Sequence, residues 1–284
     1  MPSQPICKQC GQRISGQYIQ ALGANWHPEH FLCAGCSKPL TDTRFQVHEG
    51  KPYHTECYQN HVAPRCSYCG KPLMGEYLRD YWGNLYCKEH ENQYPKCSYC
   101  GRLVPPQQQE SGTKHREDVR CPVCRASAVE SSSQAQAIFS RLKEWANRQG
   151  LANNNLNIQI ELCDRARLTK LMRENGGGRI GTDTLGITLS STLTQNGQEV
   201  RTDVTGIAVL QGLPSTLFQG VTLHELGHAW LIMQGIKGMP DWAVEGFCEL
   251  LAYRFYSELN TPESRYHAAS IEKNPDKIYG EGFR

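Results

Sequence analysis

Cysteines and histidines at short, repeated intervals fill the first 124 residues and constrain the fold of this chain most. Twelve of its fourteen cysteines lie there, mostly as pairs with two residues between them. In chain order, they and the intervening histidines form four sets of four: Cys7, Cys10, His27 and His30; Cys33, Cys36, His54 and Cys57; Cys66, Cys69, Cys87 and His90; Cys97, Cys100, Cys121 and Cys124. Four thiolate or imidazole ligands close a tetrahedral zinc site. The spacing therefore predicts four structural Zn²⁺ ions.

Disulfide bonds are the alternative explanation for so many cysteines. A disulfide scaffold would leave the histidines at ligand spacing unexplained, so we favour metal binding. A segment of roughly 60 residues buries little apolar surface, and metal binding on the order of 10 kcal/mol per site would supply much of its folding free energy. Thiolate sites of this kind need a reducing compartment, which predicts a cytoplasmic protein.

The order of the ligands distinguishes kinds of zinc module. Two residues separate His30 from Cys33, so the first two sites follow one another as in a sequential double finger. The surrounding segments 26–31 and 50–58 resemble a LIM domain, with His30 and His54 where cysteine is usual. Both histidines remain competent zinc ligands.

The next two sites resemble an irregular second copy of the same module. Six residues separate its two fingers where two are usual, and Cys87 replaces the histidine of the first finger. The two fingers therefore need not share the usual relative orientation. We predict a LIM domain over residues 1–62 and a LIM-like domain over residues 63–128, both of the small zinc-ribbon type.

The run His224-Glu225-Leu226-Gly227-His228 is a second metal-binding pattern. On a helix, histidines four residues apart project from one face and can hold one metal ion, and Glu225 between them can reach a water on that metal. In zinc peptidases with this arrangement, the imidazoles are ligands and the glutamate is the general base. The pattern predicts one catalytic Zn²⁺ held by His224 and His228, with Glu225 as the catalytic residue.

A catalytic zinc takes a third protein ligand and keeps one position open. Glu245 is the predicted third ligand, because residues 235–238 allow the first helix to end and a second to pack back. Glu249 and Asp241 are rival ligands. Glu249 is predicted instead to accept a ring N–H from a ligating histidine, and Asp241 to cap the second helix. Residues 244–249 resemble the Glu-Gly-x-x-acid helix of the gluzincins, the thermolysin-like and aminopeptidase-like zinc peptidases.

Residues 129–284 are predicted to form the α+β, zincin-like domain that carries this site. Apolar residues at helical spacing predict a helix over 133–149, with Ala137 and Phe139 on its buried face. The other predicted elements are strands over 158–162, 186–189 and 206–210 and a helix over 215–233. The strand at 206–210 is either a plain core strand or the wall of a cleft, with which an extended substrate pairs.

Residues 206–230, 245–253 and 273–284 closely resemble the LIM-domain zinc peptidases known in plants as ubiquitin-activated regulators of organ size. The order of LIM and peptidase regions matches that family, as does the segment Gly212-Leu213-Pro214-x5-Gly220-x3-His224. The resemblance implies a peptidase that hydrolyses protein substrates, with LIM modules that bind substrates or partners or regulate the enzyme. Plant members carry ubiquitin-interacting helices before the LIM domain. No acidic helix of that kind precedes Cys7, so ubiquitin dependence is not expected to transfer.

Charge and hydropathy argue against other classes of protein. The net charge is +2 and the isoelectric point about 7.9, and no basic stripe with interleaved aromatic residues is present. These features speak against a nucleic-acid partner. No apolar run reaches the roughly 18 residues that a membrane span needs. A catalytically silent LIM adaptor is the alternative function. The intact Glu225 counts against it, because loss of that carboxylate is the simplest route to an inactive enzyme.

In the predicted mechanism, Glu225 takes a proton from water on the zinc and returns it to the leaving amine. An oxyanion donor is also expected. Four tyrosines of the C-terminal region are candidates, and we favour the last of them: Tyr253, Tyr256, Tyr266 and Tyr279. Cys163 and Cys248 have no ligand partner nearby in sequence and are predicted to be small buried apolar residues.

Overall fold

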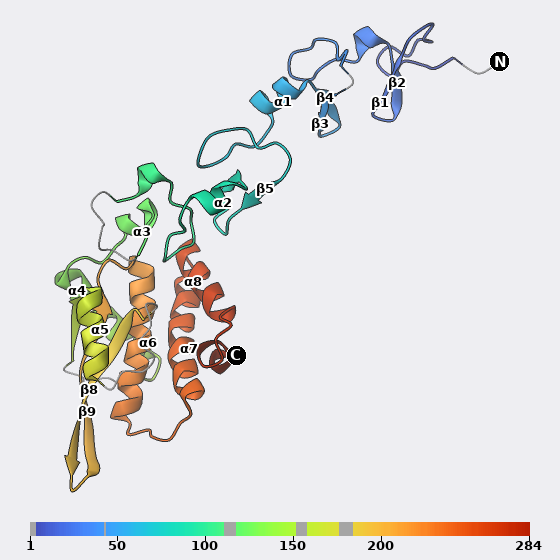
Figure 1. The fold of residues 1–284 in the computed structure, drawn as a ribbon. Helices are drawn as coiled ribbons and strands as arrows, with labels where there is room; N and C mark the ends of the chain where they lie inside the picture. The colour runs from blue at the N-terminus through green and yellow to red at the C-terminus, as the bar shows by residue number, and fades with distance from the viewer. Residues whose placement is uncertain (1–3, 43, 111–117, 152–157, 176–183) are drawn as a thin grey trace. The chain divides into compact units, whose positions relative to one another are not determined.

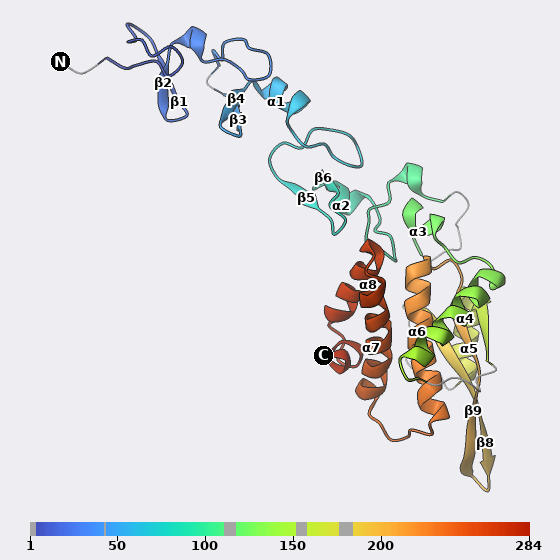
Figure 2. The same cartoon turned by 180° about the vertical axis from the view of Figure 1, so that it is seen from behind.

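The computed structural model describes residues 4–42, 44–110, 118–151, 158–175 and 184–284 of the 284-residue chain. The chain divides into two compact units, Met1–Pro95 and Lys96–Arg284. Figure 1 and Figure 2 show the elements of each unit from two opposite sides.

The N-terminal unit consists of small antiparallel hairpins and short helices. Its elements are β1 (Ile19–Ala21), β2 (Ala24–Trp26), η1 (Pro28–His30), β3 (Gln46–His48), β4 (Lys51–Tyr53), α1 (Thr55–His61), β5 (Tyr77–Arg79), β6 (Leu85–Cys87) and α2 (His90–Gln93). The strands pair in sequence order, β1 with β2, β3 with β4 and β5 with β6. The turn between β1 and β2 contains Leu22 and Gly23, and the turn between β3 and β4 contains Glu49 and Gly50. All four residues have positive φ. This backbone is typical of tight type I′ hairpins.

The apolar core of the N-terminal unit is small. Phe31, Cys33 and Leu40 form one buried cluster, and Trp26 and Phe45 pack against it. One of these three residues is itself a predicted zinc ligand. A core of this size agrees with the expectation that metal binding contributes much of the folding free energy.

The C-terminal unit is a mixed α/β structure with one described sheet. Its elements are η2 (Pro106–Gln108), α3 (Pro122–Ala126), α4 (Ser132–Arg148), β7 (Gln159–Cys163), α5 (Arg165–Glu174), β8 (Gly186–Gln195), β9 (Gln198–Leu210), α6 (Ser215–Met233), α7 (Asp241–Leu259), α8 (Pro262–Glu272) and α9 (Tyr279–Phe283). The strand order is β7-β9-β8, with β7 parallel and β8 antiparallel to β9. The central strand is therefore β9.

The helix predicted over 133–149 is α4, and its buried face differs from the predicted one at three positions. Ser131 caps it in a capping box with Gln134. Phe139 is buried as predicted, but Ala137 is exposed, and Ala135 and Ile138 are buried instead. The prediction for Ala137 was wrong because it lies two residues from Phe139, about 200° around the helix.

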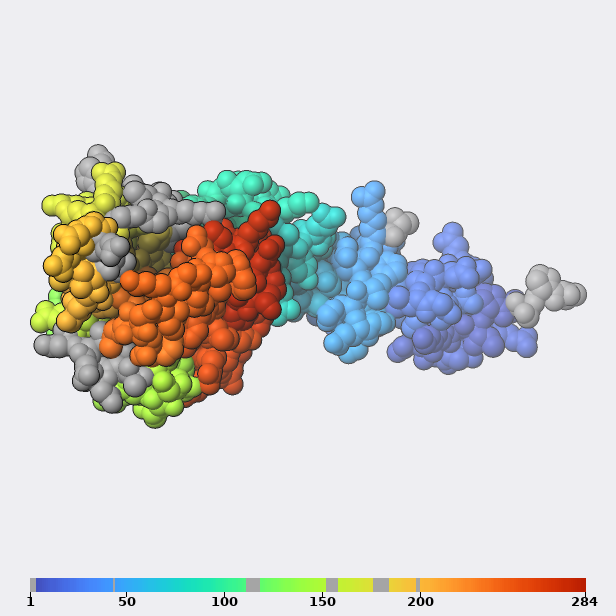
Figure 3. Space-filling view, turned by 90° about the horizontal axis from the view of Figure 1, so that it is seen from below, coloured from blue at the N-terminus to red at the C-terminus, as the bar shows by residue number. Residues whose placement is uncertain are grey.

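The strands predicted at 186–189 and 206–210 are parts of one long hairpin. The strands β8 and β9 meet at the turn Asn196-Gly197, where both residues have positive φ. The outer part of the hairpin is exposed, as at Leu193, which is 63% exposed. Figure 3 shows the end of the unit where the hairpin (gold) and the connection between α6 and α7 (orange) face the viewer. Apolar side chains of that connection, such as Ile236 and Met239, are also exposed.

The helices α6 and α7 pack against each other through small residues. A Cβ on Gly227 of α6 would lie 2.9 Å from Sγ of Cys248, and one on Gly220 would overlap the ring of Tyr256. On another side of α7, Gly246 lies so close to Gly282 of α9 that a Cβ would meet its backbone oxygen at 2.1 Å. These close approaches bring α6, α7 and the C-terminal segment together at the site described next.

Candidate metal centre

The four sets of cysteine and histidine predicted from the spacing each come together in space. In each set the ligand atoms lie within 4.8 Å of one another, close enough to share a metal ion. The sets that begin with Cys7, Cys33 and Cys66 lie in the N-terminal unit, and the set that begins with Cys97 lies in the C-terminal unit. Residues 63–128, predicted as one LIM-like domain, therefore extend across the division between the compact units. Sets of thiolate and imidazole ligands suit structural zinc.

The first cysteine of the N-terminal sets is buried and receives backbone N–H groups. Burial raises the pKa of the Cys7 thiol, but hydrogen bonds, the largest from the backbone of His27, outweigh this and lower it to about 5. Burial likewise raises the pKa of Cys33, but hydrogen bonds, the largest from the backbone N–H of His54, together outweigh it and lower the pKa to about 6. The thiolate is the form of cysteine that binds zinc, so the backbone prepares these sulfurs for a metal.

A fifth group of ligands lies between α6 and α7. The Nε2 atoms of His224 and His228 are 3.2 Å apart. Oε2 of Glu245, from the second turn of α7, lies 3.1 Å from the first nitrogen and 3.4 Å from the second. All three side chains are mostly buried but keep 14–22% exposure. Two imidazoles and a carboxylate that converge and retain solvent access fit a catalytic zinc with one open position.

Cys248 also lies at this site, which its position in the sequence does not indicate. It is fully buried, as predicted, but its thiol is close enough to His224 and His228 for the three to form a possible ligand set. Glu245 and Cys248 are thus competing third ligands. We favour Glu245, because its oxygen contacts both facing Nε2 atoms, whereas Sγ of Cys248 lies against the α6 backbone at Gly227.

Of the two rival ligands on α7, Glu249 lies beside the group. Oε1 of Glu249 lies 3.5 Å from Nδ1 of His224, on the side of the ring away from Glu245. This is the arrangement in which a carboxylate orients a metal-binding histidine. Asp241 was predicted to cap α7, but the N-cap is Pro240 and no side-chain capping bond is present there. The predicted cap lies one residue too far along the chain, because Asp241 is already the first helical residue.

The charges of the group are mutually stabilising. Burial raises the pKa of Glu245, but hydrogen bonds with His224 and His228 outweigh it and lower the pKa. Burial lowers the pKa of His228, but hydrogen bonds with Cys248 and Glu245 outweigh it and raise the pKa. A divalent cation among these atoms would take the place of the proton on His228, because a metal ligand must be neutral imidazole.

Glu225 is buried on α6, with 7% of its surface exposed. Oγ1 of Thr188 in β8 donates to its carboxylate at 2.8 Å. The strand that lies over Glu225 is therefore β8, and of the two alternatives for residues 206–210 the structure agrees with the plain core strand. Those residues belong to β9, which has a neighbour on both sides, whereas β8 is an edge of the described sheet.

Among the four candidate tyrosines, Tyr279 lies at the fifth group. Its ring stacks near that of His224, with centroids 6.2 Å apart. Burial and the nearby charge of Glu245 raise its pKa to about 12, so it stays a hydrogen-bond donor at neutral pH. The hydroxyl of Tyr253 donates to an exposed glutamate, Tyr256 is buried beside Gly220, and Tyr266 lies next to the fourth set of cysteines.

The fourth set of cysteines is joined to the segment that leads into α6. The backbone N–H of Val129 donates to the carbonyl of Leu213 at 2.9 Å, and that of Ser215 donates to Ser127 at 2.8 Å. Arg120, which is 6% exposed, donates to the carbonyl of Gly212 at 3.0 Å. Hydrogen bonds thus connect the fourth cluster to the segment that leads into α6, the helix that carries both histidines of the fifth group.

Comparison with known proteins finds a separate match in each of the two compact units. A LIM domain family matches residues 7–62, and a family described as Protein DA1 (DA1-like) matches residues 187–268. The chain carries a LIM domain and a DA1-like domain. Protein DA1 of Arabidopsis thaliana is 26% identical over 98% of this chain and 63% of its own length. The LIM domain-containing protein HDR3 of Oryza sativa subsp. japonica is 28% identical over 93% of this chain and 59% of its own. Protein DA1-related 7 of Arabidopsis thaliana is 30% identical over 87% of this chain and 48% of its own length.

The DA1-like match covers the residues of the fifth group from Thr188 to Glu249, and the LIM match covers the first two clusters. The third and fourth clusters and Tyr279 lie outside both matches. The chain spans about half to two thirds of the length of these relatives. LIM domains in general mediate protein interactions. No helix among the described residues is long and apolar enough to cross a membrane.

Proposed function

We propose that this chain is a zinc-dependent peptidase that hydrolyses peptide bonds in proteins. The observation that carries the proposal is the environment of Glu225. Its carboxylate is buried on the helix that supplies both histidines, and the hydroxyl of Thr188 holds one of its oxygens. A structural metal site needs no such additional carboxylate, whereas peptide hydrolysis needs a base beside the metal.

The chemistry of the donor atoms supports zinc as the metal. His224, His228 and Glu245 are the residues that would hold it, and Glu249 would fix the ring of His224 through Nδ1. When bound, zinc supplies a Lewis acid that polarises a carbonyl and lowers the pKa of water. Glu225 accepts the proton of the attacking water and passes it to the nitrogen of the leaving amine.

Two further elements fit a peptide substrate. In the sheet formed by the described residues, β8 is an edge strand that begins beside Glu225, so an extended peptide can add to the sheet there through backbone hydrogen bonds. The hydroxyl of Tyr279 is the donor that we assign to the oxyanion formed from the scissile carbonyl, because its ring lies beside His224 and it remains protonated.

The first three clusters are proposed to act as protein-binding modules. Each would use four protein ligands for its zinc, which leaves no position for a reacting water. Their role is therefore to recruit or to regulate. Every cysteine in the described residues is a free thiol, which suits a reducing, cytoplasmic location.

The test is a comparison of the wild-type protein with Glu225→Gln in a cell extract, with new protein N-termini identified by mass spectrometry. We expect the wild type to generate new termini and the variant to generate almost none. Zinc measured by elemental analysis should be equal in both proteins, since the variant keeps every ligand. The same new termini from both proteins would refute the proposal.

A further inference from the structure

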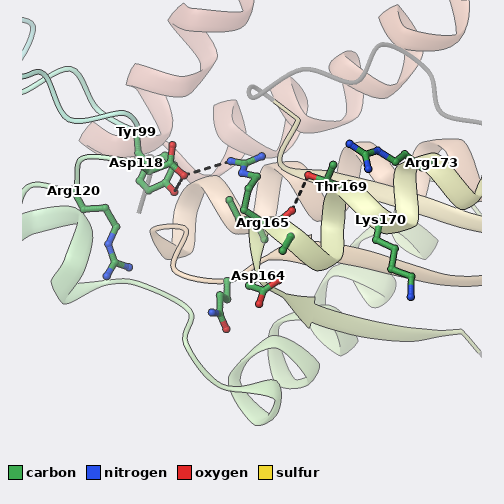
Figure 4. A pocket seen from close by; sticks show the side chains of 11 residues that line it. Tyr99, Asp118, Arg120, Asp164, Arg165, Thr169, Lys170 and Arg173 are labelled. Carbon is green, nitrogen blue, oxygen red and sulfur yellow. Dashed lines mark hydrogen bonds and ion pairs between the residues drawn. The ribbon is translucent and has the colours of Figure 1, made fainter. Parts of the chain in front are cut away.

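Paired charges line the cavity of about 620 Å³ beside α5. Figure 4 shows Arg165 of α5 joined to Asp118, which belongs to the segment of the fourth cluster. Arg120, which also lines the cavity, pairs with Glu110 and Glu130. These pairs hold α5 and the fourth cluster in place, which gives the cavity a structural role.

The segment that carries Tyr279 also depends on side chains that hold the backbone in place. Tyr279 is the first residue of α9, a helix of five residues. A helix this short is not stable by itself in water. Contacts with the rest of the unit must therefore fix the Tyr279 ring, whose centroid lies 6.2 Å from that of His224.

The carboxylate of Asp276 holds the beginning of this segment. Its Oδ1 accepts the backbone N–H of Ile278 at 2.8 Å and that of Tyr279 at 3.1 Å. The backbone carbonyl of Asp276 accepts the N–H groups of Gly280 at 2.9 Å and Glu281 at 3.1 Å. An aspartate side chain that accepts backbone N–H groups a few residues ahead is a common way to fix a turn. Asp276 thus binds the backbone of four consecutive residues that include Tyr279.

Asp276 is itself tied to the end of α8. The side chain of Asn274 accepts the backbone N–H of Asp276 at 3.0 Å. The guanidinium of Arg284 donates to the carbonyl of Asn274 at 3.2 Å and to that of Glu272, the last residue of α8, at 3.1 Å. The segment from Asn274 to Arg284 is therefore closed on itself at the end of α8.

Another side of the segment lies against α7. A Cβ on Gly282 would overlap the backbone oxygen of Trp242, and one on Gly246 would overlap that of Gly282. Gly246 directly follows Glu245, so this contact lies next to the favoured third ligand. The glycines set how closely α9 approaches α7, whereas the hydrogen bonds of Asp276 set where α9 begins.

We propose that Asp276 is a positioning residue that holds Tyr279 at the fifth group during peptide hydrolysis. This inference rests on the proposed peptidase function and on Tyr279 as the donor to the oxyanion. Asp276 acts through the backbone N–H of Tyr279 and not on the substrate directly. Because the oxyanion develops only toward the transition state, a displaced Tyr279 hydroxyl lowers kcat and leaves KM nearly unchanged.

The kinetic test compares variants of the full, zinc-loaded chain on one peptide substrate. We expect Asp276→Ala to lower kcat by about tenfold. Asp276→Asn should stay within about threefold of the wild type, because its amide oxygen can accept the same N–H groups. The matched control is Lys277→Ala, at the exposed neighbouring residue, which should stay within about twofold.

The same kinetics in a Tyr279→Phe background distinguish positioning from general support of the fold. Adding Asp276→Ala to Tyr279→Phe should change kcat by less than about twofold, because the hydroxyl that Asp276 positions is already absent. An equal loss of kcat with and without the Tyr279 hydroxyl overturns the inference.

A second measurement does not depend on activity. The chain has 13 tyrosines, and in ¹⁹F NMR of protein labelled with 3-fluorotyrosine the Tyr279 signal is the one missing from Tyr279→Phe. We expect Asp276→Ala to shift this signal and to leave most others in place, whereas Asp276→Asn and Lys277→Ala leave it unshifted. An unshifted Tyr279 signal in Asp276→Ala, or a change of all signals, overturns the inference. If the wild type has no peptidase activity, the proposed function fails, and the spectrum still shows whether Asp276 positions Tyr279.

Discussion

Oγ1 of Thr188 in β8 lies 2.8 Å from Oε2 of Glu225 and 2.8 Å from the backbone oxygen of the same residue in α6. A hydroxyl has one hydrogen, so it donates to one of these oxygens at a time. Gly186 allows this approach of strand to helix, because a Cβ there would lie 2.8 Å from Val221. The beginning of β8 therefore positions the carboxylate to which we assign proton transfer.

Replacing Thr188 with valine is expected to lower peptidase kcat/KM by roughly tenfold, since a hydrogen bond to a charged group is worth about 1.5–3 kcal/mol. Thr188→Ser keeps the hydroxyl and should stay within about threefold of the wild type. Steady-state kinetics on one peptide substrate measures both. Equal activity of the valine and serine variants would show that the hydroxyl does not position Glu225.

The choice of Glu245 over Cys248 as third ligand predicts a difference in metal content. Glu245→Ala should lose the metal of the fifth group and all peptidase activity, because two imidazoles alone bind zinc weakly. Cys248→Ser should keep the metal, since the serine hydroxyl replaces a buried thiol of similar size. Elemental analysis after dialysis against a mild chelator measures the content. The opposite pattern would make Cys248 the ligand.

Disruption of the fourth cluster is expected to impair the activity of the fifth group, whereas disruption of the third cluster is not. Cys121→Ser should lose one zinc and most activity even on a short unfolded peptide, because Arg120 and Val129 connect this cluster to the segment before α6. Cys66→Ser should also lose one zinc but keep the activity on the short peptide, since Cys66 lies in the other compact unit. An equal loss of activity on the short peptide in both variants would contradict this division.

Features that depend on short stretches of sequence were predictable. The ligands of each cluster pair within short segments, and a pair of histidines four residues apart must share a helical face. The same spacing argument places Glu249 one turn after Glu245, and its carboxylate lies 3.5 Å from the ring of His224. The predicted helix at 215–233 has the bounds of α6.

Features that depend on packing between distant segments were not predictable. Thr188 and Glu225 are 37 residues apart, and Arg120 and Gly212 are 92 apart, so no local pattern links them. Cys248 meets His228 only because Gly227 lets α7 approach α6 closely. Tertiary contacts of this kind follow from how the helices pack, which propensity and spacing do not specify.

His267 in α8 is expected to make the C-terminal unit less stable in acid. It is 9% exposed, and burial lowers its pKa to about 4, from an ordinary value of 6.5. Between these values the unfolded chain binds a proton that the folded chain does not. Stability therefore falls as the pH drops from 6.5 toward 4, by about 3 kcal/mol in total. His267→Phe should remove this part of the pH dependence, while the matched change at exposed His61 should not. Urea unfolding at pH 7.5 and pH 5 measures it, and an unchanged pH dependence in His267→Phe would show that His267 is protonated in the folded protein.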